Sequence, residues 1–292
     1  LRRQRQMCIR DSPNTKLIFG ESLSNPGVKV LDFEKFARVA RRAGIPFAVD
    51  NTFPTPCLCR PFDYGANIVT HSLSKYADGH ACSLGGIVVD KGDFDYEASG
   101  KFPGLTTPDE SYHGLVYTKA FGNLAFTAKA RAHVMRDFGM MISPMNAWLT
   151  NMNLETLPLR MQKHSENGMK LAEYLASHPK VEWVEYPGLP DSPDAKLAKK
   201  YLKACGGVMT FGPKGGRKAA EKLLNSLELA ALVIHVADAR TGVLHPASTT
   251  HRQLSDGEQR ATGILPELIR VSAGLEHIDD IIADFEQALA KI

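Results

Sequence analysis

Apolar and polar positions alternate along the first third of the chain in blocks that predict short strands separated by helices. Four apolar runs each end in a polar or loop-forming residue, as buried strands do, at residues 16–19, 46–50, 68–70 and 86–89. Between the first two runs, apolar side chains recur with helical spacing, Asp32 can cap the start of that helix, and Gly44 with Pro46 ends it. Strands that alternate with helices predict parallel pairing in a sheet covered on both faces.

The pattern changes after a long helical region at residues 144–177, which Pro158 should interrupt because proline lacks an amide hydrogen. Beyond it, strand patterns and helical patterns mix, and the last helix places its apolar residues on one face that can pack on a small sheet. The strands are expected at 207–211, 231–236 and 268–272, and the helices near 219–229 and 278–289. We therefore predict a large domain over residues 13–158 and a smaller α+β domain over 159–292.

Two segments fall outside this alternation. Residues 1–12 carry four arginines with little apolar patterning, so we expect a disordered or foreign leader. Residues 100–117 form a polar stretch that contains glycine and proline, and a loop of that length in a compact domain is more often functional than idle.

Composition narrows the class of protein. The 292 residues carry 35 basic and 32 acidic side chains, and a net charge of +3 offers no field that would recruit nucleic acid or an anionic membrane. Five cysteines without regular spacing argue against a disulfide framework, and no apolar run has the length of a spanning helix. Cys57 and Cys59 form a single close pair, which is a weak metal signal. We expect a reduced, cytoplasmic protein without a metal.

The most informative polar residues follow two of the predicted strands. Ligands of parallel sheets bind beyond the carboxyl ends of the strands. Lys75 stands there after Ser72 and Ser74, whose hydroxyls can hold a phosphate while the lysine reaches an aldehyde carbon of the same ligand. Such a lysine needs burial or a nearby cation to lower its pKa. The alternatives are a solvated lysine and hydroxyls that cap a helix.

Asp50 and Asn25 are candidates for the far side of the same ligand. A carboxylate at the end of a strand can pair with a protonated pyridine nitrogen, which keeps the ring able to accept electrons. Asn25 can donate to a phenolate oxygen on such a ring. The alternatives are an ordinary aspartate turn and an ordinary Asn-Pro turn.

Arg270 lies within a predicted strand of the second domain. Its planar guanidinium matches an amino-acid α-carboxylate bidentately, and a structural salt bridge is the competing interpretation. The loop at 245–251 holds hydroxyls and two histidines. A metal or acid–base site there is weakly supported, because no carboxylate lies between the histidines.

Taken together, these segments resemble the Cys/Met metabolism family of pyridoxal-phosphate enzymes. The similarity runs in order from about Lys16 to the C-terminus, which makes it more specific than any single motif. It rests on NP at 25–26, AVDNTF at 48–53, HSLSKY at 71–76, HPASTTH at 245–251 and RVSAG at 270–274. The segments at 104–114 and 236–241 look like the O-acetylhomoserine sulfhydrylase branch of that family rather than its γ-lyases.

The resemblance implies an α/β fold of the type I, aspartate-aminotransferase-like class, with a three-layer α/β/α large domain and a smaller C-terminal α+β domain. It implies pyridoxal 5'-phosphate as cofactor. Lys75 would form the Schiff base and shuttle a proton, and Asp50 would pair with the pyridinium nitrogen. Ser72 and Ser74 would contact the phosphate, and Asn25 the phenolate oxygen.

For the substrate, the resemblance implies that Arg270 binds the carboxylate with help from Thr250. His235 stands near that carboxylate, where many relatives have serine or asparagine. The family also has a long N-terminal part with a glycine-rich phosphate loop and a stacking aromatic before the position that matches Lys16, so the chain resembles a truncated member joined to a leader.

The reaction that the resemblance implies is γ-replacement on O-acetyl-L-homoserine. Sulfide or methanethiol would replace the acetate and give homocysteine or methionine, in a homotetramer with shared active sites. A γ-lyase that acts on cystathionine or methionine, and an inactive truncated fragment, are the alternatives.

Overall fold

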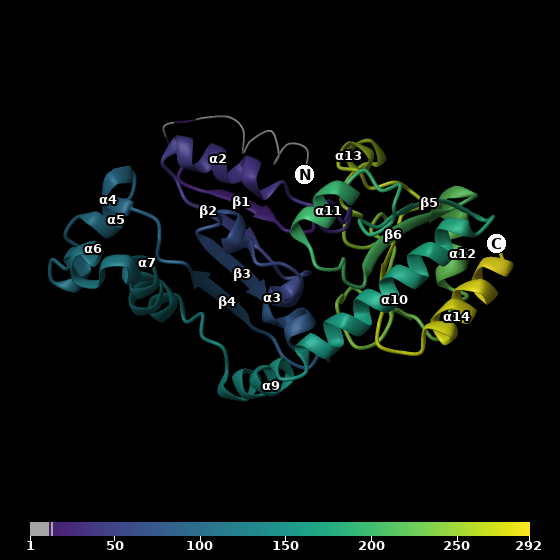
Figure 1. The fold of residues 1–292 in the computed structure, drawn as a ribbon. Coiled ribbons are helices and arrows are strands. Elements are labelled where there is room, and N and C mark those ends of the chain that lie inside the picture. Colours follow the sequence, from purple (N-terminus) through teal and green to yellow (C-terminus); the bar gives the residue numbers. More distant parts are fainter. Residues whose placement is uncertain (1–11, 13) are drawn as a thin grey trace.

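The computed structural model describes residue 12 and residues 14–292 (Figure 1). Apart from Ser12, the expected leader lies outside the described residues. Two β-sheets organise the chain, one of four strands and one of five, and a long helix extends from the first toward the second.

The first sheet has the strand order β1-β2-β3-β4. Its strands are β1 (Ile18–Glu21), β2 (Phe47–Asp50), β3 (Ile68–Ser72) and β4 (Gly86–Asp90). The first two pairings are parallel, as predicted, but β4 runs antiparallel to β3, so the prediction of parallel pairing is wrong there. The reason is the connection at residues 73–85, a tight turn and a loop without the long helix that usually returns a chain for parallel pairing.

Helix α2 (Phe33–Ala43) packs on this sheet and begins and ends as its sequence predicts. The Asp32 carboxylate accepts a hydrogen bond from the backbone N–H of Lys35, and Gly44 ends the helix in the left-handed conformation at φ 61°. Phe33 and Phe47 are fully buried between helix and sheet. The short helix α3 (Thr55–Leu58) follows β2.

A chain of short helices lies at one end of the molecule, away from the five-stranded sheet (Figure 1). The predicted loop at 100–117 contains α5 and a 3-10 turn, and the helices that follow were not predicted from the sequence. This helical segment has a small core of its own, built from Tyr96, Leu105, Tyr117 and Ala125. Its helices are α4 (Tyr96–Ser99), α5 (Pro103–Thr106), α6 (Tyr117–Phe121), α7 (Ala125–Lys129) and α8 (Arg136–Phe138).

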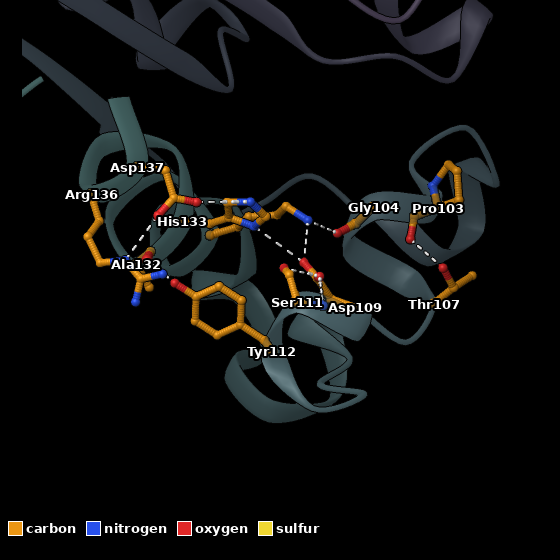
Figure 2. A network of polar contacts seen from close by, with 11 residues as sticks. Pro103, Gly104, Thr107, Asp109, Ser111, Tyr112, Ala132, His133, Arg136 and Asp137 are labelled. Atoms are coloured by element: carbon orange, nitrogen blue, oxygen red, sulfur yellow. Dashed lines mark hydrogen bonds and ion pairs between the residues drawn. The ribbon is translucent and has the colours of Figure 1, made fainter. Parts of the chain in front are cut away.

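A polar network centred on Asp109 holds this segment together (Figure 2). The Asp109 carboxylate accepts from Lys129 Nζ at 2.9 Å and from the Ser111 hydroxyl at 2.6 Å, and it lies 3.4 Å from His133 Nδ1. Lys129 also donates to the carbonyl of Gly104 at 2.8 Å. These bonds, above all the one from Lys129, hold the pKa of Asp109 well below its usual range.

Asp109→Asn is expected to loosen the helical segment, because the amide loses the charge that Lys129 and Ser111 pair with. Amide hydrogen exchange over residues 104–133 should speed up, whereas exchange in the five-stranded sheet should not change. Because the folded pKa is depressed, the wild-type contribution is present above the ordinary aspartate pKa and is lost only as pH falls below it. The difference between the proteins should therefore persist at pH 5 as well as at pH 7, and a difference that disappears at pH 5 would contradict this.

Two consecutive helices lead to the second sheet. Helix α9 (Pro144–Leu154) ends just before Pro158, and α10 (Leu157–Ser177) carries that proline in its first turn, so the predicted interruption is confirmed. The second sheet has the order β5-β6-β9-β8-β7, and all its pairings are antiparallel except β7 with β8. Its strands are β5 (Val181–Glu185), β6 (Val208–Pro213), β7 (Ala231–Leu232), β8 (Gly242–Leu244) and β9 (Ile269–Ser272).

The strand expected at 231–236 is only two residues long, and β5 and β8 were not predicted. The remaining helices are α11 (Ala195–Tyr201), α12 (Gly216–Leu224), α13 (Asp256–Ala261) and α14 (Ile278–Ala290). Helix α14 buries Ile281 and Phe285 in the same core as strands β6 and β9, as its apolar face predicts. No helix within the described ranges is long and apolar enough to cross a membrane.

Candidate active site

Lys75 lies in a tight turn directly after strand β3. Residues Leu73–Ala77 form a single π-helical turn, inside which Lys75 has the non-helical angles φ −100° and ψ −133°. Ser72 stands at the N-cap of this turn but makes no capping bond with its side chain, and its backbone N–H donates to Thr52 Oγ1 at 2.8 Å. Ser74 Oγ accepts from the backbone N–H of Gly85 at 3.1 Å. The hydroxyls therefore do not serve as a helix cap.

The turn is anchored by two buried groups on its C-terminal side. The Tyr76 side chain is fully buried, and its hydroxyl accepts from the backbone N–H of Gly207 at 3.1 Å. Arg160, on α10, donates through Nη1 to the carbonyl of Tyr76 at 2.6 Å and through Nη2 to the carbonyls of Ala77 and Asn153 at 3.3 and 2.8 Å. Helix α10 and the residue before strand β6 thus fix the backbone that carries Lys75.

Gly79 makes the approach of Arg160 possible. Its φ is +71°, which disfavours any side chain, and a Cβ built there would lie 2.2 Å from Arg160 Nη1. The guanidinium therefore occupies the space that only glycine leaves free.

Asp50 lies at the carboxyl end of β2, next to Glu21 at the end of β1 and Thr70 on β3. One carboxylate oxygen of Asp50 accepts from the backbone N–H of Thr52 at 2.9 Å, the turn contact expected of an aspartate at this position. The other oxygen accepts from the Thr70 hydroxyl at 3.4 Å. Burial lowers the pKa of the adjacent His71, while the charge of Asp50 opposes that shift.

Arg270, on β9, is buried, and no carboxylate lies within ion-pair distance of it among the described residues. Its guanidinium donates instead to Asn25 Oδ1 at 3.2 Å and to the carbonyl of Ile234 at 2.8 Å. The structural salt bridge weighed for this residue is therefore not seen. Burial lowers the pKa of Arg270 to about 10, the direction expected for a buried cation without a counter-ion.

His235 lies beside the lysine, in the loop between β7 and β8. Its Nδ1 is 3.4 Å from Lys75 Nζ. Burial, and then the positive charge of Arg270, lower the pKa of Lys75. Burial, and then Lys75, lower the pKa of His235. Lys75 thus has the environment that the sequence argument required of a nucleophilic amine.

Two residues of the 245–251 loop are paired with neighbours within it. Thr250 is exposed, and its hydroxyl lies 2.9 Å from His251 Nδ1. His245 is buried and contacts Ser248 Oγ and the carbonyl of Pro266 at 2.8 and 2.7 Å.

Sequence reasoning missed two residues of this site. Glu21 lies in register with Asp50, its carboxylate accepts from the backbone N–H of Asn25 at 3.2 Å, and burial raises its pKa. Its position at the end of a predicted strand was the available signal. Arg160 gave none, because its partners are carbonyls far away in the sequence.

The site thus combines a half-buried amine of lowered pKa, a carboxylate at the end of the adjacent strand and a buried guanidinium that has no counter-ion within the described part of the chain. A family model for Cys/Met metabolism PLP-dependent enzymes matches residues 4–290. The chain belongs to this family. The resemblance seen in the motifs is confirmed, and so is pyridoxal phosphate as the cofactor of the family.

Relatives of this family member include enzymes of sulfur amino-acid synthesis. The chain is 50% identical over 279 residues to the homocysteine synthase of Schizosaccharomyces pombe, covering 94% of this chain and 65% of that protein. It is 46% identical over 288 residues to the O-acetyl-L-homoserine sulfhydrylase of Leptospira meyeri, covering 95% and 65%. The chain therefore spans less than two thirds of the length of these relatives.

A solved structure described as an O-acetylhomoserine (thiol)-lyase from Campylobacter jejuni has the same fold. The TM-score is 0.94 at 38% identity, with 98% of this chain and 68% of that chain covered. One lysine of that protein carries a pyridoxyl phosphate group. The expected type I fold class is thereby confirmed.

The residues of this chain fit pyridoxal phosphate. An amine for its aldehyde is available at Lys75, and a carboxylate for its protonated ring nitrogen at Asp50. Arg270 and the enclosed, unpartnered Nε2 of His235 leave donors available for an anion.

Proposed function

We propose that the protein is a pyridoxal-phosphate enzyme of γ-replacement, which exchanges the acetate of O-acetyl-L-homoserine for sulfide or methanethiol and gives homocysteine or methionine. The observation that supports this most directly is the position of Lys75, half-buried and beside His235, with Arg270 buried and without a carboxylate partner among the described residues. The relatives that share these motifs are homocysteine synthases and O-acetylhomoserine sulfhydrylases.

Each residue has a distinct task in this proposal. Lys75 Nζ would hold the cofactor through its aldehyde and, as a free amine, would accept the proton from the substrate α-carbon. Asp50 keeps the ring nitrogen protonated by ion pairing. When bound, pyridoxal phosphate supplies an electron sink for the charge left on the α-carbon. Ser72 and Ser74 contact the phosphate, and Asn25 contacts the phenolate oxygen.

Arg270 binds the substrate carboxylate. Its guanidinium is desolvated and held by two neutral acceptors, so a bidentate carboxylate supplies the charge that the pocket lacks. Thr250 and His235 lie on the loops that border this position. We further propose that the enzyme works in the cytoplasm as a homotetramer.

The function is tested by supplying pyridoxal phosphate and O-acetylhomoserine with and without sulfide. The assay uses the chain alone and the chain joined to the part of the Leptospira meyeri relative that it does not span. Homocysteine that depends on sulfide is the expected product, whereas ketobutyrate and ammonia would identify a γ-lyase.

Lys75→Ala should abolish homocysteine formation, because the amine that holds the cofactor and moves the α-proton is gone. Lys119→Ala, at an exposed lysine of the helical segment, is the matched control and should keep full activity. Equal product from wild type and Lys75→Ala would refute the assignment.

A further inference from the structure

His235 is placed to exchange a proton with Lys75. Its Nδ1 lies 3.4 Å from Lys75 Nζ, the one side-chain bond that the structure gives to this amine among the described residues. When Lys75 is an ammonium group it has only hydrogens to offer, so Nδ1 then presents its lone pair and the ring hydrogen is on Nε2. The neutral tautomer that fits is therefore the one able to take a proton from the lysine.

The charges around His235 limit how many protons the pair can hold. Among the charges around the imidazole, Lys75 in the π-helical turn disfavours its protonation most; Asp238 and Asp78 favour it, and Arg270 on β9 disfavours it less strongly. If both Lys75 and His235 were protonated, two positive charges would lie 3.4 Å apart beside a buried guanidinium that has no counter-ion. One proton on the pair avoids this repulsion.

The loop geometry makes the contact a fixed one. The carbonyl of Ile234, the residue before His235, accepts from Arg270 at 2.8 Å, and two residues further on the backbone N–H of Ala237 donates to Ser272 Oγ at 2.8 Å. Both partners lie on β9, so the loop is tied to the sheet on each side of the imidazole.

We propose that Lys75 and His235 form a pair that holds a single proton at neutral pH, and that His235 Nδ1 is the base that takes this proton when Lys75 acts as a free amine. The transfer breaks one N–H bond at Nζ and forms one at Nδ1, with no other reactant. His235 is then a catalytic residue of this chain and not only a contact for the substrate carboxylate. The role of His235 as a base for Lys75 rests on the proposed function, whereas the sharing of one proton between the two side chains does not.

The shared proton is tested without cofactor or substrate. The titration of His235 is followed by NMR of its imidazole Cε1–H in the wild type, in Lys75→Met and in Lys75→Gln. Removing the lysine should raise the pKa of His235 in both variants, because the cation that disfavours its protonation is gone. An unchanged titration in the variants would overturn the pairing, and two variants guard against misfolding of one.

The base role is tested by the rate at which the amine reacts. The absorbance change on adding pyridoxal phosphate should develop about 100-fold more slowly in His235→Gln, which keeps a hydrogen-bond acceptor but takes up no proton. Free imidazole should restore part of the rate in His235→Gly. A normal rate in His235→Gln would exclude His235 as the base. If the wild type and its variants show the expected titration and rates of adduct formation but the wild type forms no homocysteine, the proposed reaction is wrong and the shared proton stands.

Discussion

Arg160→Met is expected to lower the free energy of unfolding by about 3–5 kcal/mol, because the buried carbonyls that Arg160 bonds lose a charged donor. The methionine fills similar space but offers no hydrogens to the carbonyls of Tyr76, Ala77 and Asn153. The side chain is only 6% exposed, so water cannot easily replace it.

Urea unfolding, followed by circular dichroism, measures this loss. The matched control is Arg131→Met at an exposed arginine of the helical segment, where the change should stay within about 0.5 kcal/mol. If the two variants lose equal stability, Arg160 is not the anchor of the lysine turn.

Arg270→Lys is expected to raise the KM for the amino-acid substrate about 100-fold with a smaller change in kcat, because a buried carboxylate would lose its bidentate partner. A lysine keeps the positive charge, so the variant separates geometry from charge. The contacts with Asn25 and Ile234 would be lost as well, since the ammonium cannot span both acceptors.

Steady-state kinetics with varied O-acetylhomoserine measures the effect. The measurement uses whichever form, the chain alone or the joined chain, produces homocysteine in the function assay. Arg252→Lys, at an exposed arginine of the neighbouring loop, is the control and should leave KM unchanged. A large fall in kcat with unchanged KM would place Arg270 away from the carboxylate.

The local pattern predicted those elements whose ends carry their own signals. Helix α2 has an aspartate cap and a terminal glycine, and α10 has a proline in its first turn, so both followed from the sequence. The placement of Lys75 and Asp50 beyond the strand ends also followed, because carboxyl ends of adjacent parallel strands meet at one edge.

The features that the sequence did not predict depend on contacts between residues far apart in the chain. Nothing in the pattern of β4 says that the chain turns back antiparallel after the short connection at 73–85. The two-residue β7 reads as a longer strand because residues 233–236 are mostly apolar, yet they leave the sheet to bring His235 to the lysine. Arg160 bonds carbonyls more than eighty residues away, which only tertiary packing can align.

We propose Lys75 as the amine that holds the cofactor. The most direct measurement is to incubate the protein with pyridoxal phosphate, reduce it with borohydride, digest it and find the modified lysine by mass spectrometry. We predict that the pyridoxyl group is on Lys75 at a stoichiometry near one. A group spread over exposed lysines such as Lys119, with Lys75 unmodified, would show that Lys75 does not hold the cofactor.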